Sequence, residues 1–294
     1  MINKAVNINS MHFFKYLLYL QIFFATQVLS GESPVLLDNG EYKIPAIYST
    51  PSETGKYPAV ILLHGTASNK NEVGDLYALL AKQLRDNQIA SIRIDFAGTG
   101  DSQVDYLKYT LDSALADANR ARQFLREQPQ IDSDDIAVLG FSQGGLIAQL
   151  LVIEHPELAA LVTWSSVAGD GIEPFSSLFH RYYKQALDNG FAPLTFDWRG
   201  PLNLSLQWFE QVKKQKSFTG LVEYHGPTLA IAGGADTLVD ANSSVRLIQR
   251  VGSEDAQVVI LKGADHIFNV FDPEAKQHAT LQKITLQWLV EKLH

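Results

Sequence analysis

Short apolar runs alternate with longer helix-forming stretches along most of this chain, and this alternation constrains its fold most strongly. The apolar runs are at residues 58–63, 89–94, 136–139, 158–164, 227–232 and 257–261, after a weaker alternating run at 41–50. Apolar residues at helical spacing fill the stretches 72–87, 111–127, 144–153, 241–251 and 273–293. Strands and helices in this order predict an α/β protein with a mostly parallel sheet and right-handed crossovers. Functional residues are then expected at the carboxyl ends of the strands.

One segment interrupts the alternation. Residues 170–226 separate two predicted strands, although a connection between a strand and its helix usually has about 2–6 residues. The segment is rich in Phe, Tyr and Trp. We expect an inserted cap over the functional edge of the sheet. Most of its rings should form the cap's own core, and two or three should line a pocket.

The first 30 residues differ from the rest of the chain. They hold two lysines and no acidic residue, an apolar run at 16–24 and small residues near the end. This pattern predicts a secretory signal peptide at residues 1–30 and a folded domain at 31–294, exported to the periplasm or secreted. A retained membrane anchor is the alternative. The apolar run is shorter than the ~20 residues of a spanning helix, so we expect cleavage and no stable membrane insertion.

Composition excludes several kinds of protein. The chain has no cysteine, which excludes disulfides, thiolate metal sites and a cysteine nucleophile. Its formal net charge of −8, without a basic run, argues against a nucleic-acid partner. No paired-histidine pattern indicates a metal and no glycine-rich loop fits a phosphate, so no cofactor is expected. Nothing in the sequence indicates an oligomeric state.

A predicted strand-to-helix turn carries the strongest chemical motif. Gly140-Phe-Ser-Gln-Gly144 matches G-x-S-x-G, directly after the run at 136–139 and before an apolar helix. Small neighbours allow the strained turn that raises a nucleophilic serine above a sheet. An ordinary helix N-cap is the simpler interpretation of Ser142, but the flanking glycines favour a nucleophile.

A serine hydroxyl needs a base, and His266 follows the last predicted strand. His64 also follows a strand. It is the alternative base, although a role in holding its own loop suits that position better. The remaining histidines lie in the signal segment, the cap or helices.

The base needs a carboxylate to orient it, and Asp236 follows the run at 227–232. The resulting order Ser142, Asp236, His266 is the one that G-x-S-x-G hydrolases use. Asp170, after the preceding strand, is the main competitor. Asp265 neighbours the histidine, and Asp240 is better suited to capping the next helix.

Attack by a serine creates an oxyanion that two backbone N–H groups must stabilise. One is predicted to be that of Gln143, directly after the nucleophile. The other is predicted to be that of Thr66, in the turn after the run at 58–63, where Gly65 permits an unusual backbone.

Taken together, these motifs resemble the α/β-hydrolase superfamily over nearly everything after residue 40. The resemblance rests on five ordered segments: His64-Gly-Thr66, Asp95-Phe-Ala-Gly-Thr-Gly-Asp-Ser102, Phe141-Ser-Gln-Gly-Gly145, Gly233-Gly-Ala-Asp236 and Gly263-Ala-Asp-His266. It implies the α/β-hydrolase fold, with a cap inserted after the sixth strand.

Within that superfamily the loop and the elbow look most like those of the cinnamoyl (feruloyl) esterases. This resemblance implies hydrolysis of small-molecule carboxylic esters, including hydroxycinnamoyl esters, without a cofactor. Ala97 and Thr99 replace the Asn and His that the family often has, which leaves the substrate open. A peptidase, thioesterase or lipase with the same triad is the alternative. A non-catalytic binding scaffold is a further one, although scaffolds usually lose a triad residue or the elbow glycines.

Overall fold

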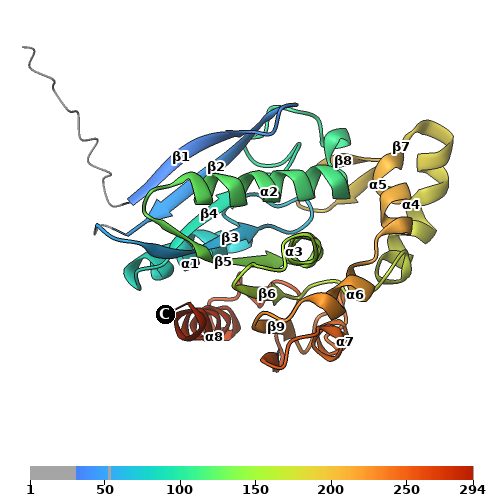
Figure 1. The fold of residues 1–294 in the computed structure, drawn as a ribbon. Helices are drawn as coiled ribbons and strands as arrows, with labels where there is room; N and C mark the ends of the chain where they lie inside the picture. Colours follow the sequence, from blue (N-terminus) through green and yellow to red (C-terminus); the bar gives the residue numbers. More distant parts are fainter. Residues whose placement is uncertain (1–30, 52–53, 294) are drawn as a thin grey trace, which may run out of the picture.

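The computed structural model describes residues 31–51 and 54–293, and an eight-stranded sheet forms its centre (Figure 1). The strand order is β1-β2-β4-β3-β5-β6-β9-β10. Strands β1 and β2 are antiparallel to their neighbours, and the other strands pair in parallel. The strands are β1 Gly31–Asp38, β2 Lys43–Thr50, β3 Tyr57–Leu63, β4 Ala90–Ile94, β5 Ile131–Phe141, β6 Ala160–Trp164, β9 Thr228–Gly233 and β10 Ala256–Leu261. The mostly parallel sheet of the prediction is therefore confirmed.

The sequence pattern missed one strand of the central sheet. Edge strand β1 pairs with β2 along its whole length, yet only Leu37 in it is buried. Its one apolar run, Val35-Leu36-Leu37, has three residues after a polar start, which is too short to mark a strand that faces solvent at most positions. The structure also begins β5 five residues earlier than the run at 136–139 indicates. The predicted signal peptide at 1–30 lies outside the described residues.

Helices cover both faces of the sheet, as Figure 1 shows. Helices α2 (Leu111–Glu127) and α3 (Gln143–Glu154) pack on one face, and α1 (Leu76–Asp86) and α8 (Gln277–Lys292) pack on the other. Helix α7 (Asn242–Arg250) connects β9 to β10. Helix α2 begins at a capping box in which Thr110 and Ser113 exchange hydrogen bonds. Among residues 31–51 and 54–293, no helix combines the length and apolarity that a membrane span requires.

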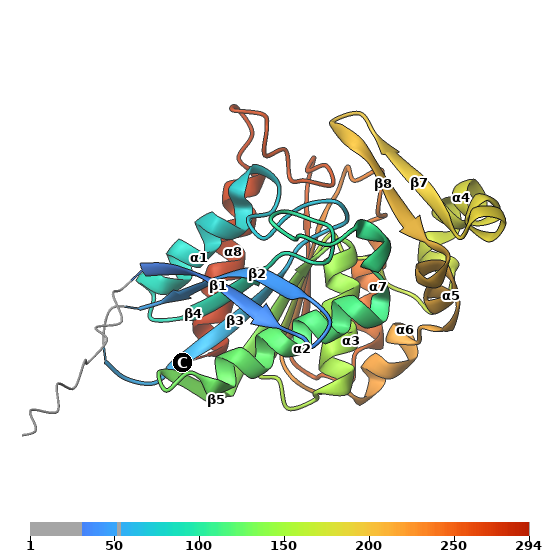
Figure 2. The ribbon, with the colours of Figure 1, turned by 90° about the horizontal axis from the view of Figure 1, so that it is seen from above.

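The cap is a subdomain between β6 and β9, beside the carboxyl ends of the strands (Figure 2). It contains α4 (Ser176–Asn189), the antiparallel hairpin β7 (Phe191–Phe196) and β8 (Arg199–Ser205), α5 (Leu206–Lys214) and α6 (Ser217–Gly220), with short 3-10 turns η3 (Glu173–Phe175) and η4 (Leu221–Glu223). An insertion after the sixth strand is thus present, in the position that the resemblance implies.

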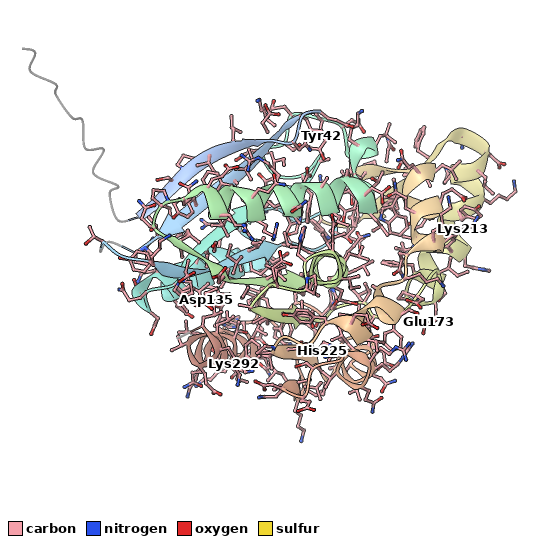
Figure 3. The ribbon with its side chains drawn as sticks, in the orientation of Figure 1. Tyr42, Asp135, Glu173, Lys213, His225 and Lys292 are labelled. Atoms are coloured by element: carbon pink, nitrogen blue, oxygen red, sulfur yellow. The ribbon has the colours of Figure 1, made fainter. Side chains whose placement is uncertain are left out.

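An aromatic cluster holds the cap together. It consists of Phe175, Phe179, Tyr183, Trp208 and Phe209, whose ring centroids lie 5.0–6.4 Å from those of their neighbours. Trp208 and Phe209 are fully buried. Charged groups lie outside this cluster: Figure 3 shows Lys213 and Glu173 on the outer parts of the cap. The expectation that most cap rings are structural is therefore confirmed.

Candidate active site

Ser142 occupies the turn between β5 and α3. Its backbone has φ 52° and ψ −118°, a strained conformation for a non-glycine residue. The Ser142 N–H donates to the carbonyl of Trp164, at the end of β6, over 2.8 Å. A Cβ on Gly140 would lie 2.1 Å from the carbonyl oxygen of Gly144, and a Cβ on Gly144 equally close to that of Leu63. The elbow therefore depends on the close backbone approach that only glycine permits.

His266 lies in the loop after β10, 124 residues from the serine in sequence. Its Nε2 is 3.1 Å from the Ser142 Oγ. The imidazole packs on the ring of Phe141 at a centroid distance of 5.0 Å, and 14% of its side chain is exposed. The base and the hydroxyl are within proton-transfer distance before any substrate binds.

Asp236, after β9, contacts the other side of the imidazole. Its Oδ2 is 2.7 Å from Nδ1 of His266, and its Oδ1 accepts the N–H groups of Leu238 and Val239. The side chain is fully buried. Burial raises the pKa of this carboxyl. The hydrogen bond from His266, the charge of His266 and the hydrogen bonds from the two backbone amides lower it by more, so the pKa lies below its ordinary value. An ionised Asp236 places the proton on Nδ1 and leaves Nε2 free to accept.

The three other aspartates considered as partners of His266 make hydrogen bonds elsewhere. The carboxylate of Asp170 accepts the N–H and the hydroxyl of Thr219, so it is engaged in the cap. Asp265 accepts backbone N–H groups of its own loop, and Asp240 accepts the N–H of Asn242 at the start of α7. Of the four candidates, Asp236 is the one that contacts His266.

Thr66 and Gln143, predicted to supply the oxyanion-binding N–H groups, meet beside the elbow. The Thr66 hydroxyl donates to Oε1 of Gln143 over 2.8 Å. Within the described part of the chain, the backbone N–H of neither residue donates to a protein acceptor. For Gln143 this is expected, since the first N–H groups of a helix lack intrahelical partners. Two unpaired donors thus lie close to the nucleophile.

The sequence analysis missed Glu72, which anchors the loop that carries Thr66. One carboxylate oxygen accepts the N–H of Gly65 over 2.7 Å, and the other accepts the hydroxyl of Ser68 over 2.6 Å. Glu72 is buried and its backbone has φ 62°. A glutamate at the start of a predicted helix gives no sign that its side chain turns back to the preceding loop.

His64 holds the same loop from its other side. Its Nδ1 is 2.7 Å from the Gly65 carbonyl oxygen, and its Nε2 accepts the N–H of Phe96 over 3.2 Å. Burial lowers the pKa of His64, against the opposing effect of the Glu72 charge. The neutral ring ties two loops together, as predicted for a loop-holding residue, and all of its nitrogens are engaged away from Ser142.

Asp95 was also missed. Its buried carboxylate accepts the backbone N–H groups of Lys70 and Asp101 and the ammonium of Lys70. A Cβ on Gly100 would collide with this carboxylate, which explains the glycine pattern of the loop. The Gly-x-Gly segment wraps around an aspartate of its own chain, and its glycines serve packing within the fold.

Known proteins show the same architecture. Residues 60–276 match the family described as "Alpha/beta hydrolase family". An uncharacterized protein of Mycobacterium tuberculosis (strain ATCC 25618 / H37Rv) is 26% identical, over 82% of this chain and 75% of its own length. The mitochondrial palmitoyl-protein thioesterase ABHD10 of Homo sapiens is 24% identical, over 81% of this chain and 75% of its own.

A solved structure is similar throughout the fold. Est1E from Butyrivibrio proteoclasticus with bound ferulic acid superposes with a TM-score of 0.71 at 19% identity, over 88% of this chain and 98% of the other. At this identity the similarity concerns the fold. With the family match over most of the chain, it confirms the predicted superfamily. The chain belongs to the alpha/beta hydrolase family.

Proposed function

We propose that this protein hydrolyses carboxylic esters through an acyl-enzyme on Ser142. The observation that carries the proposal is the continuous hydrogen-bond chain from Ser142 Oγ through His266 to Asp236, with distances of 3.1 and 2.7 Å. This chain starts at a strained elbow in a member of a hydrolase family. Nucleophile, base and orienting acid are therefore already arranged for acyl transfer.

Acylation begins when His266 Nε2 takes the proton of Ser142 as Oγ attacks the ester carbonyl. Asp236 stabilises the resulting imidazolium through Nδ1–H. The carbonyl oxygen becomes an oxyanion, and in this proposal the N–H groups of Thr66 and Gln143 donate to it. The C–O bond to the alcohol then breaks, and the alcohol leaves with the proton that His266 returns.

Deacylation repeats these steps with water. His266 takes a proton from water, hydroxide adds to the acyl carbonyl, and the serine leaves with the proton. No atom outside the protein, the ester and water is required for this sequence. We propose aromatic acyl esters, hydroxycinnamoyl esters among them, as the substrates to test first. The elbow motif supports this class, as does an exposed Trp198 in the cap, whereas the loop departs from the family pattern at Ala97 and Thr99.

A thioester is the second candidate substrate. The human relative that matches most of this chain is named as a palmitoyl-protein thioesterase. The same acyl-enzyme would form, and a thiol is an easier leaving group because its pKa of about 8.5 is far below that of an alcohol. Thioester hydrolysis thus needs no residue beyond those already described.

The test measures turnover of p-nitrophenyl acetate, p-nitrophenyl butyrate, methyl ferulate, an S-palmitoyl peptide and an aminoacyl p-nitroanilide, with Ser142→Ala beside the wild type. Ester turnover that the variant loses supports the proposal, and a preference for methyl ferulate supports the aromatic class. Turnover of only the S-palmitoyl peptide moves the protein to thioester hydrolysis, and turnover of only the anilide moves it to peptidases. Ester turnover that persists in Ser142→Ala contradicts the mechanism.

We further propose that the protein is exported after cleavage near residue 30. Strand β1 begins at Gly31, so removal of residues 1–30 would keep every strand of the described sheet. The test is expression of the full chain in a bacterial host, followed by intact-mass measurement of periplasmic and membrane fractions. A full-length product in the membrane fraction would favour the retained anchor.

A further inference from the structure

The cap contacts the loop of Thr66 through one charge-assisted hydrogen bond. Arg199, the first residue of β8, donates from Nη1 to the carbonyl oxygen of Ala67 over 2.6 Å. These residues are 132 positions apart. Ala67 is buried, and its φ of 63° places a non-glycine residue in the left-handed region. Such a conformation persists when its surroundings hold it, and Arg199 is one of the groups that do so here.

Arg199 lies at the tip of the cap hairpin. Phe196 pairs with Arg199 across the β7–β8 ladder, so Asp197 and Trp198 form a two-residue turn. The guanidinium is 5.7 Å from the Trp198 ring, and that side chain is 67% exposed. In Figure 2 the hairpin projects at the same edge of the molecule as the loops that follow the strands. A substrate group that packs on the Trp198 ring would therefore lie directly beside the Arg199 guanidinium.

A row of packed rings links the same two regions. Strand β8 packs on the 3-10 turn η2 (Tyr106–Lys108). Tyr106 of that turn stacks on Tyr109, directly after it. Tyr109 contacts Phe96, and Phe96 contacts His64; the three centroid distances are 5.1, 5.7 and 4.8 Å. All four rings are buried. Because His64 holds the Gly65 carbonyl, the hairpin supports the loop through these rings as well as through Arg199.

Core and cap hold different parts of the loop. From the core, Glu72 contacts Gly65 and Ser68, at its two ends. From the cap, Arg199 contacts the carbonyl of Ala67, the residue directly after Thr66. The Thr66 N–H shares its peptide unit with the Gly65 carbonyl, which His64 holds from the core. The cap orients the peptide unit after Ala67, two units farther along the same loop. An oxyanion donor must lie within about 0.5 Å of its productive position, so small movements here affect rate.

We propose that Arg199 is a positioning residue through which the cap hairpin aligns the Thr66 N–H. A substrate whose apolar or aromatic part packs on Trp198 draws the hairpin onto the core, fixes Ala67 and stabilises the oxyanion. The inference rests on the proposed acyl-transfer function. Part of the energy of binding the distal group is then used in the transition state, so larger substrates gain in kcat.

The kinetic test compares Arg199→Ala, Arg199→Lys and, as matched control, Arg181→Ala, an exposed arginine on α4 of the cap. For methyl ferulate or p-nitrophenyl butyrate, Arg199→Ala should lower kcat about tenfold while KM changes less than twofold. Lysine can still donate one hydrogen bond and should recover most of kcat, whereas Arg181→Ala should match the wild type. A change in KM alone, or equal effects in both alanine variants, would overturn the proposal.

A second readout needs no substrate. Hydrogen–deuterium exchange of a peptide spanning residues 64–75 should be severalfold faster in Arg199→Ala and unchanged in Arg181→Ala. If no ester is hydrolysed by the wild type, the proposed function fails while exchange still decides the coupling. If exchange is the same in all three proteins, the coupling is refuted even for an active esterase.

Discussion

The active-site edge of the sheet and the cap are built in different ways. At the edge, short polar contacts join loops from distant parts of the chain, His266 to Ser142 and Asp236 and Thr66 to Gln143, and Glu72 holds Gly65 within one loop. Close backbone packing at the elbow adds to them. In the cap, tilted and edge-on rings join η3, α4 and α5, and Trp208 lies at their centre.

Because of this difference, the two regions should respond differently to substitutions. Hydrogen bonds at fixed distance define atomic positions, which catalysis needs, and the loss of one buried partner leaves the other unsatisfied. Ring packing depends mainly on apolar area and volume, so it supports stability and accepts varied shapes. We therefore expect substitutions at the edge to lower rate more than stability, and substitutions in the cap core to do the reverse.

The largest effect should follow Asp236→Asn. The amide cannot hold the proton of His266 on Nδ1, so kcat should fall about 10⁴-fold while the melting temperature changes little. Steady-state kinetics and thermal denaturation measure the two quantities. Asp170→Asn is the matched control and should keep kcat within a few-fold. The reverse ranking would assign the orienting role to Asp170.

Trp208→Ala tests the cap, the other region of the comparison. Removing this fully buried ring should lower the free energy of unfolding by about 3–5 kcal/mol. Well below the melting temperature, Ser142 should still react with a fluorophosphonate probe at a rate close to that of the wild type. Urea denaturation and labelling kinetics provide the measurements. A labelling rate that falls as steeply as stability would show that edge and cap are not separable.

A buried acid outside both regions gives stability its own pH dependence. Asp117 on α2 accepts hydrogen bonds from Asn39 and Tyr42, and burial raises its pKa to about 7 despite these bonds. Figure 3 shows Tyr42 near α2. Between pH 4 and 7 the folded state keeps a proton that the unfolded state loses. The free energy of unfolding therefore falls as pH rises, by at most about 4 kcal/mol.

Asp117→Asn should remove that component of the pH dependence, because the amide is neutral throughout. Urea unfolding of the variant and the wild type at pH 4.5, 6 and 8 measures the contribution of Asp117 to the free energy of unfolding. The substitution of the exposed Asp134, Asp134→Asn, is the control. Parallel curves for Asp117→Asn and the wild type would show that Asp117 is ionised across the range. Activity profiles can then be corrected for stability before edge and cap are compared.

The smallest effect is expected at the contact between the two predicted oxyanion donors. Thr66→Val keeps the backbone N–H and removes the hydroxyl that donates to Gln143, so kcat should fall about fivefold, equivalent to one hydrogen bond of about 1 kcal/mol. Thr66→Ser keeps the hydroxyl and should stay near the wild-type value. If valine and serine behave alike, the side-chain contact has no part in alignment.

Much of the fold was predictable because its signals are local. Apolar runs marked β3, β4, β5, β6, β9 and β10, and the G-x-S-x-G turn placed Ser142 where the structure has it. Exposed β1 carried only a three-residue apolar run. The cap was recognised by length and composition, but its helices and hairpin were not predicted, since their order depends on which rings pack together.

The sequence by itself determined the order of strands and helices along the chain, the elbow and the histidine after the last strand, because these follow from periodicity and from residues adjacent in the chain. Only the tertiary structure decided which aspartate meets His266, how Glu72 anchors its loop and that Arg199 reaches Ala67. The contacts of His266 and Arg199 depend on distances between loops far apart in sequence, and that of Glu72 depends on how its own loop folds back. Short-range patterns carry no information about such distances, whereas packing of the whole sheet defines them.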